Sequence, residues 1–180
     1  MTRARPILIA CLVASATILP GCALKPLYAG GGAGPVAMTL SSVSVAPIEG
    51  EAGWLVRGAL IERLRAAGEG QPRYRVEVRL DDSIAGFGVR ADDSVTRERR
   101  TLRARWQLVD TADGSTVIDT SAASDSGIDS VGSEYATIAA ERTALERLSV
   151  EIADQIIARI AVYARNRAAG AEAPAAPAGQ

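Results

Sequence analysis

The chain has 180 residues, and its 20 Lys and Arg against 21 Asp and Glu give a formal charge of −1, which offers no reason to expect nucleic acid as a partner. It contains no His and two Cys, so it lacks the commonest general base and the commonest metal ligand. Hydrophobic residues make up 48% and aromatic residues 4% of the chain, which predicts one globular domain with an aliphatic core.

The first residues are typical of an export signal. Arg3 and Arg5 precede an uncharged, mostly apolar stretch from Ile7 to Leu19, which has the length of a secretory signal and is too short to span a bilayer. Leu19-Pro20-Gly21-Cys22 then resembles a lipobox, the cleavage signal of bacterial lipoproteins, with Pro20 as a departure from the usual pattern. The alternative is a plain signal peptide that happens to end beside a Cys.

The lipobox predicts that residues 1–21 are removed and that Cys22 becomes a lipidated N-terminus. Lipoproteins of this kind carry three acyl chains on the Cys, and two chains already suffice for stable anchoring. Ala23 stands where an Asp typically retains lipoproteins in the inner membrane. The resemblance therefore implies anchoring in the outer membrane, facing the periplasm. Residues 22–35 are rich in Gly and are expected to form a flexible tether.

The folded part is expected to begin with a strand and a helix. Val36–Ile48 is rich in Val, Ser and Thr and alternates in part, which predicts a strand that ends at Pro47. Trp54–Ala67 has apolar residues at i+4 spacing, as in an amphipathic helix, and Gly68 is expected to end it.

Three strands are predicted next. Residues 73–80 alternate, with Tyr74, Val76, Val78 and Leu80 on one side, and this pattern indicates a strand with one solvated face. The rest of this region is read as a bend or bulge at Gly86-Phe87-Gly88, a turn at Asp92–Ser94, a strand over Val95–Asp110, a hairpin at Asp113-Gly114 and a weaker edge strand over Thr116–Ile128.

A long amphipathic helix from about Ser133 to Arg167 is predicted by the stripe Ile138, Leu145, Leu148, Ile152, Ile156, Ile160 and Tyr163. Residues 36–168 thus form a single α+β domain of order β-α-β-β-β-α, with a four-stranded, mainly antiparallel sheet and two helices packed on one face. The other face carries alternating Arg and Glu, which indicates that it meets water or a partner. Residues 169–180, rich in Ala and Pro, are expected to be a disordered tail.

No catalytic constellation is visible, and we expect a protein that is not an enzyme and that uses no metal or cofactor. Asp81-Asp82 and Asp92-Asp93 are adjacent carboxylates, which point opposite ways on an extended chain and make a poor acid–base pair. Trp54 and Trp106 are expected to be core or interface anchors.

The most unusual local composition is the run from Arg97 to Arg105, with five Arg and one Glu in nine residues. On a strand, Arg97, Arg99, Arg103 and Arg105 share one direction, whereas Arg100 points the other way with Leu102 and Trp106. Four such groups would repel each other unless anions or carboxylates meet them, and guanidinium binds phosphate and carboxylate in bidentate fashion. The alternative is a solvated strand face without a partner.

The segment Gly21-Cys22-Ala23-Leu24-Lys25-Pro26-Leu27-Tyr28 resembles the start of the mature LPS-assembly lipoproteins (LptE), which often read Gly-Cys-x-Phe-x-Pro-Leu-Tyr. Leu24 replaces the usual aromatic residue. The order of elements and the long last helix are also similar to that family. The resemblance implies a lipoprotein that plugs the LPS-translocon β-barrel (LptD) of the outer membrane in a 1:1 complex, assists barrel assembly and binds lipopolysaccharide.

Two choices stay open at the level of the sequence. The chain could instead be a periplasmic auxiliary lipoprotein of a lipid ABC transporter, which can also be a small sheet-plus-helix domain. The arginine strip Arg97, Arg99, Arg103 and Arg105 could contact phosphates of lipopolysaccharide or carboxylates of the barrel wall.

Overall fold

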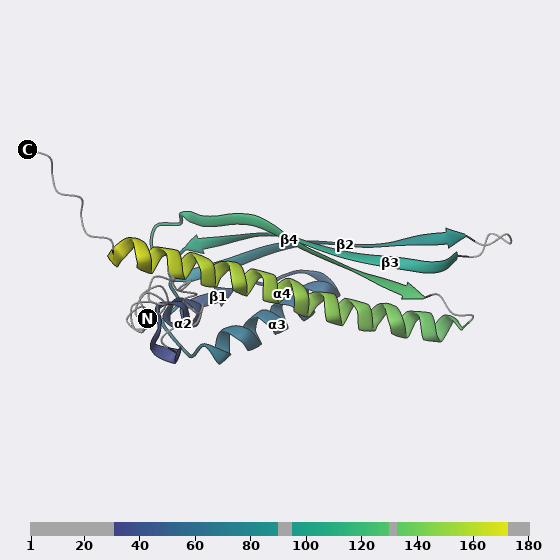
Figure 1. Ribbon diagram of the computed structural model, residues 1–180, viewed down its shortest axis with the longest axis horizontal. Helices are drawn as coiled ribbons and strands as arrows, with labels where there is room; N and C mark the ends of the chain where they lie inside the picture. Colours follow the sequence, from purple (N-terminus) through teal and green to yellow (C-terminus); the bar gives the residue numbers. More distant parts are fainter. Residues whose placement is uncertain (1–30, 90–94, 130–132, 173–180) are drawn as a thin grey trace, which may run out of the picture.

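The protein is described by a computed structural model, which covers residues 31–89, 95–129 and 133–172. A sheet forms one layer and the helices form the other, along one elongated body (Figure 1). The elements in chain order are η1 (Gly31–Ala33), α2 (Pro35–Ser41), β1 (Val43–Val45), α3 (Gly50–Ala66), β2 (Tyr74–Val89), β3 (Val95–Asp110), β4 (Thr116–Asp129) and α4 (Glu134–Glu172).

The four strands follow each other across the sheet in the order β1-β2-β3-β4. β1 pairs parallel with the start of β2, whereas β2, β3 and β4 pair antiparallel over their length. The predicted α+β class and the mainly antiparallel four-stranded sheet are therefore confirmed, and β4 is an edge strand as expected.

Alternation along the strands decides which face is buried. The register places Val76 opposite Leu108 and Val78 opposite Trp106, and all four side chains are buried against the helices. Their neighbours along the chain point to the other side of the sheet, because successive strand residues alternate between faces. We call this second side, away from the helices, the open face.

The long helix α4 covers the sheet over β3 and β4 and also packs against α2 and α3. Its buried stripe begins at Ala144 and Leu145 and includes Leu148, Ile152, Ile156 and Ile160. Ile138 was expected in this stripe but is 55% exposed, since the stripe starts two turns later. The helix also extends to Glu172, so it includes the first residues that the sequence assigns to a disordered tail.

The segment before β1 differs from the prediction. Residues 36–41 belong to the helix α2 instead of a strand, and only Val43–Val45 is extended. Pro35 is the first residue of α2, a position where its fixed φ favours a helix. Val36 and Leu40, four residues apart, are both 2% exposed. Burial of that one helical face prevails over the β propensity of Val and Thr.

The sequence predicts a bulge or bend at Gly86-Phe87-Gly88. No bulge interrupts the β2–β3 ladder, which stays in register from Tyr74 opposite Asp110 to Phe87 opposite Arg97. The irregularity lies instead in the β3–β4 ladder, between Leu108 and Val109. The predicted hairpin at Gly114 is confirmed: its φ of 75° is a left-handed value that glycine adopts at no steric cost.

Several sequence predictions concern residues outside the described ranges: the signal 1–21, Cys22 with most of the tether, the turn at Asp92–Ser94 and the tail from residue 173. They stay predictions. In the part of the chain that the structure describes, no helix has the length and apolar character needed to cross a membrane.

Candidate functional site

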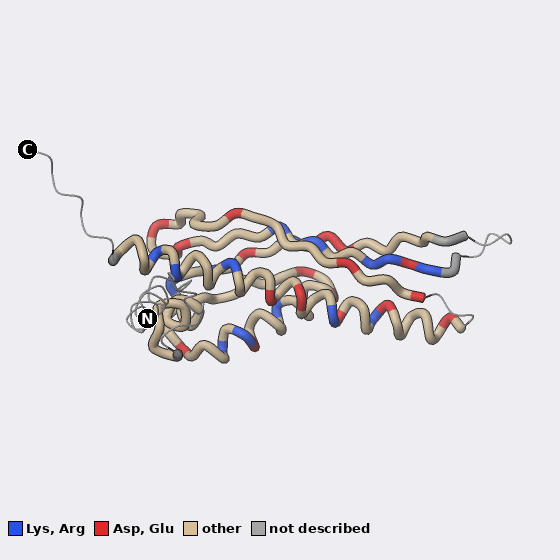
Figure 2. The backbone as a smooth tube through the Cα atoms, viewed as in Figure 1, with Lys and Arg blue, Asp and Glu red and all other residues tan. Residues whose placement is uncertain are grey.

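The open face carries charged side chains from three strands. β2 contributes Arg75, Glu77, Arg79 and Asp81, β3 contributes the arginine strip, and β4 contributes Asp119, Asp125 and Asp129. Figure 2 shows the basic run of β3 between strands that carry acidic residues. The four arginines of the strip are exposed and share this face as predicted, while Arg100 lies on the helix side.

Three of the four strip arginines are paired within the sheet. Arg97 Nε lies 3.2 Å from Asp129 Oδ1, and Arg99 Nε lies 3.6 Å from Asp125 Oδ2. Arg105 donates two hydrogen bonds of 3.0 Å to the carboxylate of Asp119. The sequence argument expected anions from outside to meet these charges. In the structure, aspartates of the edge strand β4 already pair with Arg97, Arg99 and Arg105.

The Arg105–Asp119 pair also changes how both groups titrate. The hydrogen bond from Arg105, and then one from Gln107, lowers the pKa of Asp119 below its ordinary value. In turn, the hydrogen bond to Asp119, followed by its charge, raises the pKa of Arg105. The side chains of Arg105 and Asp119 are 66% and 37% exposed, so the ion pair fixes their orientation more than it stabilises the fold.

Arg103 differs from the rest of the strip. It lies opposite Asp81 on β2 and opposite Ala123 on β4, but no ion pair joins Arg103 to a carboxylate among the described residues. The same holds for Arg79 on β2. Among the described residues, these two guanidinium groups are the cations of the open face that form no ion pair, although Asp81 lies opposite Arg103.

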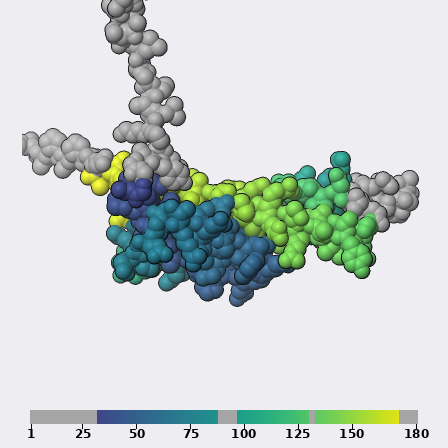
Figure 3. Space-filling view, turned by 90° about the horizontal axis from the view of Figure 1, so that it is seen from below, coloured from purple at the N-terminus to yellow at the C-terminus, as the bar shows by residue number. Residues whose placement is uncertain are grey.

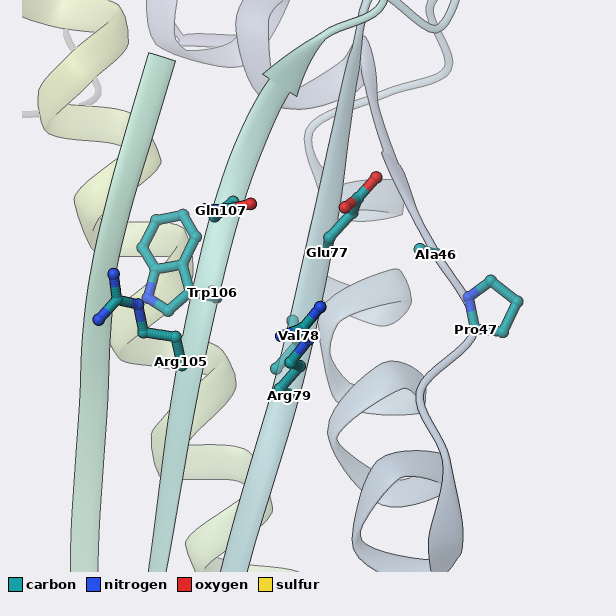
Figure 4. Close-up of a pocket in the computed structure, with 8 residues that line it drawn as sticks. All are labelled: Ala46, Pro47, Glu77, Val78, Arg79, Arg105, Trp106 and Gln107. Atoms are coloured by element: carbon teal, nitrogen blue, oxygen red, sulfur yellow. The ribbon is translucent and has the colours of Figure 1, made fainter. Parts of the chain in front are cut away.

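Arg79, Arg103 and Arg105 surround two adjoining hollows. One has a volume of about 480 Å³ and is lined by all three together with Asp81, Ser121 and Ala123. The other, of about 540 Å³, shares Arg79 and Arg105 and adds Glu77 and Gln107. Figure 4 shows Arg79 on β2 and Arg105 on β3, with Pro47 on the segment after β1 at the far side. Both hollows are open, and their walls offer guanidinium groups to an anion.

Arg100 is a structural residue. Its guanidinium binds Asp82, with Nη2 2.6 Å from Oδ2, and donates a hydrogen bond of 2.9 Å to the carbonyl of Glu141 on α4. The side chains of Arg100 and Asp82 are only 13% and 26% exposed. This contact joins the sheet to the beginning of α4, which explains why one arginine of the run turns away from the others.

The sequence analysis missed Arg79 and the aspartates of β4. Arg79 was seen only as part of an alternating strand, and its place beside the strip depends on the β2–β3 register. The aspartates lie at or near the positions opposite the arginines, at Asp119, Asp125 and Asp129. Their signal was present, because an edge strand with an Asp every few residues beside an Arg-rich strand favours cross-strand ion pairs.

The two tryptophans have different surroundings. Trp106 is 1% exposed and belongs to the core, whereas Trp54 on α3 is 74% exposed. A core role for Trp54 is therefore wrong, and an interface role stays a prediction. In the described ranges, no group of three or more potential metal ligands comes together.

The fold is shared with solved lipoproteins. A Caulobacter crescentus protein described as a lipoprotein is 27% identical, with a TM-score of 0.58 over 73% of this chain and 98% of that one. The rare lipoprotein B from Shewanella oneidensis is 13% identical, with a TM-score of 0.57 over 71% and 97%. A minor lipoprotein from Acinetobacter baumannii is 10% identical, with a TM-score of 0.52 over 68% and 92%. The last two show likeness of fold alone.

A comparison with curated protein sequences found no match. A family model described as LptE, lipopolysaccharide-assembly, matches residues 40–160, which is about two thirds of the chain. That range includes β1 to β4, the open face and most of α4. The match confirms the family that the N-terminal motif indicated, although the motif lies outside the matched residues. The chain therefore belongs to the lipopolysaccharide-assembly family LptE.

Proposed function

We propose that this chain is an outer-membrane lipoprotein, anchored through Cys22 and facing the periplasm, that assists assembly of the LPS-translocon β-barrel LptD and plugs its lumen. In this role the open face meets lipopolysaccharide on its way to the outer leaflet. The observation that carries the proposal is the charged open face with Arg79 and Arg103, whose guanidinium groups form no ion pair with a described residue, on a chain of the LPS-assembly family.

The shape of the domain supports a place inside a barrel. The 39 residues of α4 run the length of the molecule (Figure 1), which corresponds to about 58 Å of helix. The apolar band of an outer-membrane barrel is only about 25 Å tall, and the interior of such a barrel is polar. A narrow domain with a charged face along its length therefore suits that interior better than a lipid surface.

The chemistry of the hollows supports lipopolysaccharide over the barrel wall as the partner of the open face. Lipid A and the inner core carry phosphates, and a guanidinium group binds phosphate in bidentate fashion. Asp119, Asp125 and Asp129 already neutralise Arg97, Arg99 and Arg105. A carboxylate-rich barrel wall would meet these aspartates as well, and like charges repel. A compact phosphate can bind between Arg79 and Arg103 in the hollow whose β4 wall consists of Ser121, Ala122 and Ala123 and includes none of these aspartates.

Binding to purified lipopolysaccharide tests this assignment. We expect Arg79→Gln with Arg103→Gln to weaken binding by about a hundredfold, since two charge-assisted hydrogen-bonding groups are lost, and to leave the barrel complex intact. The matched control is Arg57→Gln, an exposed arginine of α3 on the other layer. Unchanged lipopolysaccharide binding in the double variant would refute the phosphate site, and loss of the barrel complex instead would make the hollows a protein interface.

Co-purification tests the partner class. Tagged protein extracted in mild detergent should retain a large outer-membrane β-barrel at one copy each. Recovery with an inner-membrane permease would favour the transporter reading instead. A Cys22→Ser variant tests the anchor separately. It should lack the added mass of the acyl chains and should no longer fractionate with the membrane.

A further inference from the structure

A third hollow with exposed cations lies at the end of the molecule where α2 and the end of α4 meet, which we call the near end. Its volume is about 340 Å³, and its lining includes Pro35 and Met38 of α2, Tyr74 at the start of β2 with Arg73 just before it, and Arg167 of α4. Figure 3 shows residues of α2 beside the last turns of α4 at this end. The open face and its hollows do not include any of these residues.

Two aromatic hydroxyls hold one arginine in this hollow. Arg167 donates hydrogen bonds to the hydroxyl oxygens of Tyr74 and Tyr163, the latter at 3.3 Å. The two rings pack edge to face with centroids 6.3 Å apart. The guanidinium of Arg73 lies over the ring of Tyr74, 5.5 Å from its centroid. Arg167 is thus held by neutral groups, in a fixed orientation beside a second arginine.

The charge of the hollow is positive. Asp110, with a side chain 10% exposed, lies 3.4 Å from Arg73 and also accepts a hydrogen bond from the backbone N–H of Ala112. It therefore balances Arg73. No carboxylate among the described residues forms an ion pair with Arg167, and the hydrogen bond to Tyr163 raises the pKa of Arg167. The guanidinium of Arg167 therefore gives the hollow a positive charge that no described carboxylate pairs with.

The expected lipid anchor at Cys22 lies only a short stretch of chain away from the near-end hollow. The described chain begins at Gly31, just before Pro35 in the wall of the hollow, and Cys22 precedes Gly31 by nine residues. Those residues reach at most about 32 Å, whereas α4 extends about 58 Å to the other end. The near end is therefore the part of the domain closest to the leaflet that holds the anchor.

The lining suits a lipid headgroup. The hollow sets the guanidinium groups of Arg73 and Arg167 beside apolar surface from Met38, which is 59% exposed, and from alanines of α4. The hydroxyls of Thr39 and Ser42 donate to carbonyls of α2, so the arginines are the donors for a phosphate. We propose that the near-end hollow binds the phosphate of an anionic phospholipid in the leaflet that holds the anchor, with Arg167 as the main contact. This inference rests on anchoring at Cys22, which is part of the proposed function.

Such a contact would fix how the domain stands on the membrane. The acyl chains hold the protein through a tether, which alone leaves the orientation free. A bound headgroup at the near end would direct the opposite end, where β2 ends and β3 begins, away from that leaflet. This is the orientation in which a plug enters a barrel from the periplasmic side.

Vesicle binding tests the proposal without the anchor or the barrel. The mature chain, residues 22–180 with Cys22→Ser, contains every described element and carries no lipid. We expect it to bind phosphatidylglycerol vesicles and not phosphatidylcholine vesicles. Arg167→Gln should weaken that binding about tenfold, since a charge-assisted hydrogen-bonding group is lost. The matched control is Arg165→Gln on the same helix, which lies outside the hollow and should weaken binding less, by at most about fivefold, which is what one cation near a charged surface contributes.

The outcomes are distinct. Equal losses for Arg167→Gln and Arg165→Gln would mean diffuse attraction to a charged surface and would overturn the site. If Arg167→Gln lost lipopolysaccharide binding but kept phosphatidylglycerol binding, the site would also be overturned, because the occupant of the hollow would then be the transported lipid. Where circular dichroism shows that Arg167→Gln fails to fold, Arg73→Gln is measured instead. A loss of binding is again expected, because Asp110 would then lie beside the hollow without its cation. A missing barrel complex or a missing acyl chain would leave this result unaffected.

Discussion

Arg79 lies directly opposite Arg105 across the β2–β3 ladder, on the open face. Like charges at directly opposed positions destabilise an antiparallel pair. Asp119 on β4 relieves this repulsion through two hydrogen bonds to Arg105, and Arg79 stays without a carboxylate partner among the described residues. The sheet thus neutralises Arg105 on β3, which lies between β2 and β4, and leaves Arg79 on β2 available. This arrangement suits an anion that binds between the strands.

The pKa of Asp119 reports this pairing. The hydrogen bonds from Arg105 and Gln107 lower it, and a lowered folded-state pKa adds stability above the unfolded pKa that is lost as pH falls through the folded one. In an NMR titration, Arg105→Gln should raise the pKa of Asp119. Asp113 is the internal control, because the backbone N–H of Ser115 lowers its pKa. If Asp119 titrates the same with and without Arg105, the pair does not persist in solution.

The core prediction concerns Ile152, which is fully buried in the stripe of α4. Ile152→Asp places an unpaired charge there and should reduce the free energy of unfolding by about 4 kcal/mol. The control is Val150→Asp, two residues away on the same helix, where the side chain is 42% exposed. It should change the free energy of unfolding by less than about 0.5 kcal/mol. Similar denaturant midpoints for the two variants would contradict the packing of α4.

Removing an arginine of the run from Arg97 to Arg105 should cost more stability on the helix side of the sheet than on the open face. Arg100→Ala leaves Asp82 and the carbonyl of Glu141 without their half-buried partner, and we expect a loss of about 2 kcal/mol in unfolding free energy. Arg97→Ala breaks an ion pair whose side chains are 65% and 78% exposed, a kind of contact worth at most about 1 kcal/mol. Urea unfolding of both variants measures the difference, and a larger loss for Arg97→Ala would be inconsistent with the two faces assigned here.

Trp54 offers a test of the interface on the helix layer. Because its side chain is 74% exposed, Trp54→Ala should leave the unfolding free energy within about 0.5 kcal/mol. Exposed tryptophans are enriched among residues that dominate protein interfaces, so the same variant should reduce co-purification of the barrel. Trp106→Ala is the contrast, with an expected loss of about 4 kcal/mol. A Trp54 variant that retains the full amount of barrel would place α3 outside the complex.

Local patterns predicted most of this fold, and contacts between distant segments decided the rest. The alternation around Val76 and Trp106 predicted which strand face is buried, and the i+3/i+4 stripe through Ile152 predicted α4. Residues 36–41 became a helix because Val36 and Leu40 pack on elements far along the chain, which β propensity does not register. The strip was visible from its composition, but its partition into paired and unpaired arginines depends on the register with Asp81 and Asp119.

Site-specific photo-crosslinking in living cells tests the central claim most directly. A photoreactive residue at Ser121, which lines the hollow with Arg79 and Arg103, should form an adduct with lipopolysaccharide. The adduct should disappear when Arg79→Gln and Arg103→Gln are added. The same residue at Val150, on the exposed side of α4, should give none. Adducts at Ser121 only with the barrel, or lipopolysaccharide adducts that persist without both arginines, would contradict the account.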